Sequence, residues 1–200
     1  MIGTLTGSFY SGMRPSLSAN AAPPLSSISI SIWYDGADIN YFVPTNPASG
    51  ANISNWNDKS GNGHNAAPTG GANKPQYVTN EQNGKSIVRF YASDNLNTPA
   101  TYTRSQTAFG LYAVARMSTS AVSGVRTITA TDTNGYKIFF NGTNWAVQAA
   151  SCSATSTITA DASKFHIHGL LFDSSQPTTA TQLQYRYDLS AVNLTYANTP

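Results

Sequence analysis

Apolar and polar residues alternate in several short stretches of this chain, which is the pattern of a strand with one buried face. In the first stretch, 28–33, Ile28, Ile30 and Ile32 share one face and two serines share the other. Apolar and β-branched residues predict further strands at 87–91, 108–117, 125–130, 136–140, 145–149, 165–172 and 183–187. Together these stretches predict an all-β chain with few helices.

Turn-forming residues separate the predicted strands. The pair Asn134-Gly135 is typical of a β-hairpin, and the run from Asn141 to Asn144 makes a second turn. Residues 37–75 form a long irregular stretch interrupted by prolines, and loops of that length are usually functional or packed on themselves. Closely spaced strands joined by such turns favour an antiparallel β-sandwich, which we expect over residues 28–200.

The segment before this sandwich has a different character. Residues 1–27 carry one charge, Arg14, and are rich in Pro, Ser, Gly and Ala, so they predict an extended N-terminal arm. Larger apolar residues within the arm suit packing on a partner, and the alternative is a disordered leader. The expected anchor residues are Phe9, Tyr10, Met13 and Leu17.

Composition excludes several function classes. Only 10% of the residues are charged, the net charge is +2, and no cluster of basic residues supports nucleic-acid binding. The sequence contains no run of about 18 apolar residues, which is the length that would predict a membrane-spanning segment. The N-terminus also lacks the apolar core of a signal peptide. We expect the single cysteine, Cys152, to be a packing residue because a structural zinc site needs more ligands.

The most informative motif is Trp56 to Ala66, which reads W-x-D-x-S-G-N-G-x-x-A. Here a large apolar anchor precedes a dense run of turn residues. It is followed by G-K-x-x-V-R-F at 84–90. In this order the two motifs resemble concanavalin A-like lectin/glucanase domains of the laminin-G jelly-roll type. The structural residues of the first motif are Trp56, Asp58, Gly61, Asn62 and Gly63.

This resemblance implies a jelly-roll fold and a function. Many such domains are found in phage tail and virion proteins, where they bind host glycans or fix neighbouring subunits. The resemblance therefore implies a non-enzymatic virion surface protein (a tail fibre, spike or capsid decoration) that is assembled in the host cytoplasm. Residues 1–27 would contact other capsid or tail proteins, and the protein would itself form a homo-oligomer such as a trimer. The alternative is a bacterial carbohydrate-binding or adhesin module.

The resemblance also suggests that the chain is abbreviated. Similar domains usually run on past the position of Tyr185 to Asp188 with final strands that close the sheets. We therefore expect the sandwich to be C-terminally incomplete, a fragment, or completed by a neighbouring subunit, since an open edge invites association.

Glycoside hydrolysis needs two carboxylates placed across one bond. The glucanase pattern, a strand bearing E-x-D-x-x-E, is absent because Glu81 is the only glutamate. We therefore expect no enzymatic activity, and a hydrolase with an unusual acid pair stands as a third hypothesis.

Two sets of residues could bind a metal. Asp35, Asp38 and Asp58 lie at turns and could hold calcium, as similar domains sometimes do; the alternative is that they accept backbone N–H bonds and shape the turns. His166 and His168 point to one face of a predicted strand. Without an evident third ligand, we interpret them as ordinary strand residues.

Glycan binding would use aromatic faces and amides in exposed loops. The candidates are Tyr34, Tyr41, Asn95, Tyr102 and Trp145. The alternative is that the aromatic rings pack in the sandwich, as we expect of Trp33 and Trp56.

Overall fold

The structure is a computed structural model of the chain. It describes residues 30–71, 73–91, 93–98, 108–118, 126–130, 136–149 and 152–197. The predicted arm over 1–27, with its anchor residues Phe9, Tyr10, Met13 and Leu17, lies outside the described residues, as does Tyr102.

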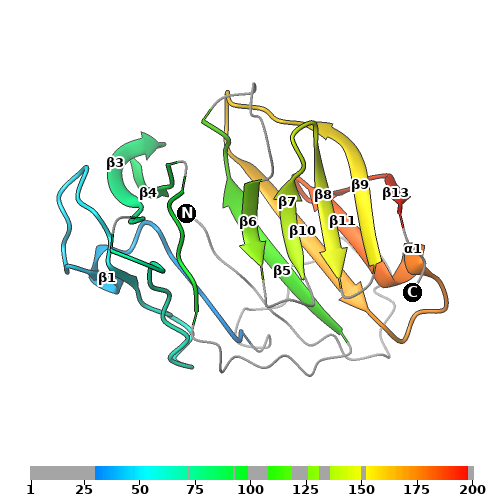
Figure 1. The fold of residues 1–200 in the computed structure, drawn as a ribbon, viewed down its shortest axis with the longest axis horizontal. Coiled ribbons are helices and arrows are strands. Elements are labelled where there is room, and N and C mark those ends of the chain that lie inside the picture. The colour runs from blue at the N-terminus through cyan, green and yellow to red at the C-terminus, as the bar shows by residue number, and fades with distance from the viewer. Residues whose placement is uncertain are drawn as a thin grey trace, which may run out of the picture.

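Residues 30–98, which we call the N-terminal section, contain short strands joined by long loops (Figure 1). A 3-10 helix, η2 (Ile39–Tyr41), leads into β1 (Phe42–Val43), which pairs with β2 (Asn55–Trp56). The strands β3 (Gln76–Gln82) and β4 (Lys85–Arg89) form an antiparallel hairpin. The section therefore has two small sheets rather than one large one.

Residues 108–197, which we call the sandwich, form two larger sheets (Figure 1). One has the order β12-β11-β10-β5 and the other β13-β9-β8-β7-β6. The bounds of the first are Ser190–Ala191, Leu183–Tyr187, His166–Asp173 and Ala108–Ala115. Those of the second are Leu194–Tyr196, Cys152–Thr159, Asn144–Ala149, Lys137–Phe140 and Arg126–Ala130. Every pairing is antiparallel, which confirms the prediction of an all-β chain.

The two sheets of the sandwich share one hydrophobic core. Side chains of β5, β10 and β11 meet those of β7, β8 and β9 in a single buried cluster. Burial alternates along β7, where Ile138 and Phe140 are buried and their neighbours are half-buried, as a one-faced strand requires. Cys152 belongs to this core, which confirms its interpretation as a packing residue.

The N-terminal section has a second core of its own, built mainly from aromatic rings. Phe42 packs between Trp56 and Tyr77, with ring centroids 5.4 and 5.2 Å apart. The ring centroids of Tyr34 and Trp56 lie 5.3 Å apart. Such tilted ring pairs add to the free energy gained from burial alone. Trp56 is therefore the centre of this core, as expected, whereas Trp33 is only half-buried.

Two predictions of strands need correction. The described part of 28–33, residues 30–33, is not a strand, because its backbone bonds to side chains and backbone of a loop. The hairpin strand β3 and the short strands β1, β2, β12 and β13 were not predicted, and neither was the long strand β9. Its buried positions include Ala154 and Ser156, whose small side chains give little hydrophobic signal. The remaining predicted strands are confirmed with shifts of a few residues at their ends.

Helices are almost absent from the described part of the chain. The only α-helix described there is α1 (Thr179–Gln182), which precedes β11. Within the described residues, no helix has the length and apolar character needed to cross a membrane.

Candidate functional site

The motif from Trp56 to Ala66, which we call the Asp58 loop, folds around one buried carboxylate. Asp58 is 7% exposed. Its Oδ1 accepts hydrogen bonds from the backbone N–H of Trp33 and of Ser60, both at 2.9 Å. Its Oδ2 accepts from the backbone N–H of His64 at 3.1 Å and from the Ser60 hydroxyl at 2.7 Å. Burial would raise the pKa of Asp58, but these donors together hold it below its ordinary value.

The same loop holds residues 30–33, which we call the strap. The Asn62 amide donates to the carbonyl oxygens of Ile30 and Ser31 at 3.1 and 3.0 Å. The Ser60 hydroxyl oxygen lies 3.0 Å from the Ser31 carbonyl oxygen as well, so its single proton is shared between this carbonyl and Asp58. The strap's backbone groups are therefore bound by a loop some 30 residues later in the chain, which explains why no strand forms there.

Two glycines allow the loop its shape. Gly61 and Gly63 have φ angles of +88° and +76°, which lie in the left-handed region that other residues rarely adopt. The left-handed backbone therefore requires the two glycines. The polar residues of the motif are needed because they form hydrogen bonds with the strap. All five motif residues serve the local fold in this structure.

Lys59 binds two of the three aspartates that were candidate calcium ligands. Its ammonium lies 2.6 Å from Asp38 Oδ2 and 3.3 Å from Asp35 Oδ2. It also lies over the rings of Trp33 and Tyr41, 4.9 and 5.3 Å from their centroids. A hydrogen bond from Lys59 lowers the pKa of Asp38, and the same bond raises that of Lys59.

The structure does not bring Asp35, Asp38 and Asp58 together as ligands of one calcium ion. The first two carboxylates bind Lys59, and the third binds backbone N–H groups. Among the described residues, no three His, Cys, Asp or Glu side chains gather closely enough to hold a metal ion. The alternative interpretation, in which these aspartates shape turns, agrees with the structure.

The four candidate glycan residues that the structure describes do not form one surface. Tyr34 is buried in the N-terminal core and donates its hydroxyl to the His64 carbonyl. Trp145 is 2% exposed in the sandwich core, against Phe140. Neither ring is open to a ligand, so these two predictions are wrong, and the packing alternative holds for them.

The other two described candidates are half-buried in the N-terminal section. Tyr41 flanks Lys59, as described above. The Asn95 side chain accepts hydrogen bonds from the backbone N–H and hydroxyl of Thr69, at 2.8 and 2.7 Å. Both side chains already have partners within the fold, and nothing links them to each other.

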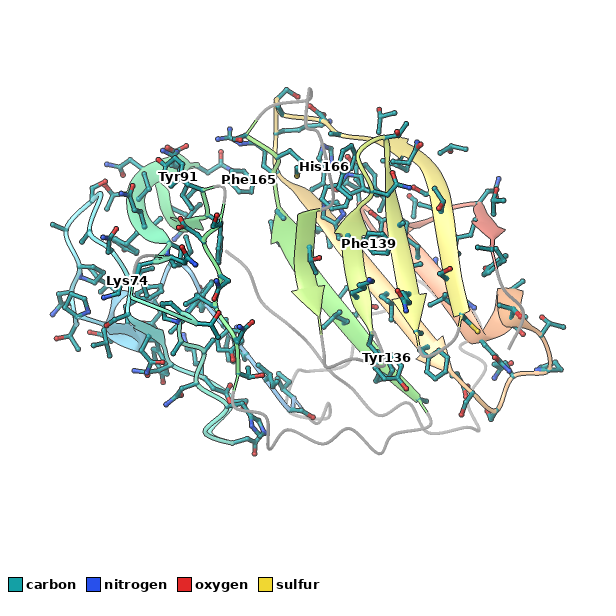
Figure 2. All side chains as sticks on the ribbon, viewed as in Figure 1. Lys74, Tyr91, Tyr136, Phe139, Phe165 and His166 are labelled. Carbon is teal, nitrogen blue, oxygen red and sulfur yellow. The ribbon has the colours of Figure 1, made fainter. Side chains whose placement is uncertain are left out.

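His166, which is labelled in Figure 2, forms contacts with two carboxylates. Its Nδ1 is 2.8 Å from Asp188 Oδ2, and its Nε2 is 3.0 Å from Asp161 Oδ2. Its ring stacks on Tyr187 with centroids 4.5 Å apart. Since a carboxylate only accepts, both bonds form when the imidazole carries two protons. The two carboxylates face opposite edges of the ring and so cannot converge on one metal ion.

His168 is 1% exposed and faces the core. Its Nδ1 is 2.7 Å from the Tyr185 hydroxyl, and its ring lies 4.3 Å from that of Trp145. Burial, helped by the charge of His166, lowers the pKa of His168 to about 4. Both histidines point to one face as predicted, and both have structural partners.

A charged cluster joins the N-terminal section to the sandwich. Glu81 on β3 forms ion pairs with Arg89 on β4 and, at 3.4 Å, with Arg116, which follows β5. The Arg116 guanidinium lies 4.9 Å from the ring centroid of Phe165. Figure 2 shows Phe165 on the sandwich, and Tyr91, half exposed, on the N-terminal section. The sequence gives no sign of this cluster, because its members are far apart in the chain.

The described residues also contain a groove of about 460 Å³ beside α1, β11, β12 and β13, which we call the edge groove. Its polar lining comes from Gln184, Asn193 and Tyr196. Sequence reasoning missed it because four separate elements and a turn contribute to it.

No family model, no curated protein and no solved structure matches this chain.

Proposed function

We propose that this chain is a non-enzymatic virion surface protein of a bacteriophage, built on a concanavalin A-like jelly roll. It would form part of a tail fibre, spike or capsid decoration, as a homo-oligomer. The resemblance of the Asp58 loop and of residues 84–90 to such domains supports the proposal, together with the two antiparallel sheets that share one core.

The observation that carries the proposal is the set of hydrogen bonds between the Asp58 loop and the strap. Asn62 and Ser60 hold the carbonyl groups of Ile30 and Ser31, so the chain that precedes residue 30 departs from a fixed point. A firm attachment of this kind is what an anchoring segment needs, because force on the anchor is then passed to the folded domain. Residues 1–27, with their apolar side chains, would be that anchor.

The non-enzymatic part of the proposal rests on the state of the carboxylates. Glu81, the only glutamate, already forms ion pairs with the guanidinium groups of Arg89 and Arg116. Asp161 and Asp188 have His166 between them, and Asp35 and Asp38 both bind Lys59. Incubation with phage-host polysaccharides and a reducing-sugar assay tests this part, and release of sugar would contradict it.

Deletion of residues 1–27 tests the anchoring. The deletion keeps Ile30 and Ser31, so we expect a folded domain with an unchanged melting temperature. Particles grown with the truncated copy alone should lack the protein, as measured by mass spectrometry of purified virions. A matched control keeps the arm and replaces only Ser11 and Ser16 by alanine, and it should be incorporated normally. Normal incorporation of the truncated chain would contradict the proposal.

A second candidate function is a bacterial carbohydrate-binding or adhesin module. The uncharged lining of the edge groove favours it, because neutral pockets with amide groups suit sugars. Neighbouring genes separate the two candidates: capsid and tail genes would favour the virion protein, whereas cell-surface genes would favour the adhesin.

A further inference from the structure

The edge groove lies where the chain passes from one sheet of the sandwich to the other. β12 belongs to one sheet and β13 to the other, and the turn between them carries Asn193. The first sheet contributes Gln184 and Tyr185, and the second contributes Leu194 and Tyr196. A volume of about 460 Å³ lies within the range of small-ligand sites.

Backbone and side-chain hydrogen bonds hold the walls of this groove. The Tyr196 hydroxyl donates to the Leu183 carbonyl at 2.9 Å, which ties β13 to the start of β11. The Val192 N–H donates to the Tyr185 carbonyl at 3.1 Å, and Leu194 pairs with Ser156 of β9. The turn that carries Asn193 is therefore fixed on both sides, and binding would require little ordering of the protein.

The lining of the groove is neutral. No charged side chain is among the lining residues, so a charged ligand would lose water without gaining a counter-charge. The apolar part of the lining, which includes Val192 and Leu194, suits the C–H face of a ring. The ligand class that combines an apolar face with many neutral hydroxyl groups is a neutral saccharide.

Two amide groups are placed to recognise those hydroxyls. Asn193 is exposed, and its side-chain amide makes no hydrogen bond to the described residues. The Gln184 amide has only a long contact, 3.4 Å, to the Thr181 carbonyl. Each amide offers two N–H donors and a carbonyl acceptor, and can therefore bind a pair of adjacent hydroxyl groups.

We propose that the edge groove binds a neutral saccharide, with Gln184 and Asn193 binding its hydroxyl groups and Val192 and Leu194 contacting its apolar face. This inference rests on the proposed function to the extent that a virion surface protein contacts host glycans. It gives that contact a location different from the residues suggested by the sequence.

The test is an array of neutral oligosaccharides of glucose, galactose, mannose and rhamnose, printed beside sialylated and sulfated glycans. We expect the full chain to bind one or more neutral glycans in preference to the acidic ones. The Q184A/N193A double variant should lose that binding at least tenfold in calorimetric titration of the best neutral glycan. Thr195→Ala is the matched control, because Thr195 is exposed on β13 but does not line the groove, and it should bind as the parent does.

Three results would overturn the inference: no binding to any neutral glycan, a preference for the acidic glycans, or unchanged affinity in a double variant whose melting temperature matches the parent. Particle incorporation reports separately on the proposed function. A double variant that loses glycan binding yet still joins particles supports the groove, and truncation of 1–27 tests anchoring without altering the groove.

Discussion

The carboxylate of Asp58 accepts a hydrogen bond from the backbone N–H of Trp33, a residue 25 positions earlier in the chain. This bond joins a loop to a segment that has no strand partner of its own. A buried acceptor that serves several backbone donors is costly to remove, because each donor is then left unsatisfied. The stability of the N-terminal section should therefore depend on this one side chain.

Replacing Asp58 by alanine tests this dependence. The change leaves the N–H groups of Trp33, Ser60 and His64 without their acceptor, so we expect a loss of about 3 kcal/mol in the free energy of unfolding. Urea denaturation followed by tryptophan fluorescence measures it. The control is Asp173→Ala, which removes only contacts within three residues along the chain and should cost about 1 kcal/mol or less. Equal losses in the two variants would contradict the prediction.

Replacing Gly61 by alanine tests the backbone of the Asp58 loop. No atom lies within 4 Å of the position of an added Cβ, so the cost comes from the positive φ alone, about 1 kcal/mol. Gly71→Ala is the matched control, because it has equal space and no positive φ, and it should be neutral or slightly stabilising. Thermal unfolding of the two variants side by side decides the prediction. A Gly61→Ala variant as stable as Gly71→Ala would refute it.

Gly169 on β10 should be sensitive for a different reason. An added Cβ would lie 2.7 Å from Cε1 of Tyr112, the residue paired with it on β5. The ring must move, so we expect Gly169→Ala to lower the free energy of unfolding by about 2 kcal/mol. A double-mutant cycle with Tyr112→Ala measures the coupling, since the added methyl group should cost much less once the ring is gone. Additive effects would show that the clash is not the cause.

Acidification should destabilise the sandwich through His168. Its pKa of about 4 in the folded chain lies below the ordinary 6.5, so the unfolded chain binds the proton more readily. The contribution of neutral His168 is complete above pH 6.5 and is lost as the pH falls toward 4. The expected loss is about 3 kcal/mol over this window.

Urea denaturation at pH 7, 5.5 and 4 measures this loss, with His168→Gln as the comparison. The variant should show a shallower pH dependence, whatever its stability at pH 7. Bonds from Ser163 and then from His166 hold the pKa of Asp161 at about 2, so its contribution is lost only below pH 3.8, outside this window. Parallel pH profiles for the parent and the variant would contradict the assignment to His168.

The sequence predicted the longer strands of the sandwich whose buried residues are large, but not β1, β2 and β3 of the N-terminal section. Phe109, Leu111, Leu170 and Phe172 mark β5 and β10 clearly, and both strands were predicted near their observed positions. β9 escaped prediction because its buried face is made of Cys, Ala and Ser residues, whose periodicity is weak. Its place in the sheet is set by its neighbours β8 and β13, which is tertiary information.

The strap shows the opposite error. Ile28, Ile30 and Ile32 alternate as in a strand, yet the backbone bonds of the described part go to the Asp58 loop. Alternation predicts which side chains face a core, and Ile32 is indeed buried. Alternation does not predict which segment forms hydrogen bonds with the backbone.

The candidate site was the least predictable part. An aromatic residue that binds a ligand is exposed, whereas one in a core is buried, and the sequence alone does not show this difference. It therefore suggests Tyr34 and Trp145 as glycan-binding residues, although both are buried. The edge groove is instead lined by Gln184 and Asn193. Their neutral amides form no motif in the sequence, and only the fold brings them to one place.

The burial of Cys152 makes this chain convenient for site-specific chemistry. The only thiol in the sequence is 2% exposed within the sandwich core, so reagents that modify cysteines from solution have little access to it while the domain is folded. A cysteine introduced at an exposed position such as Thr195 would then carry a single fluorophore, without removal of the native residue. Slow modification of Cys152 itself would report how often the sandwich opens.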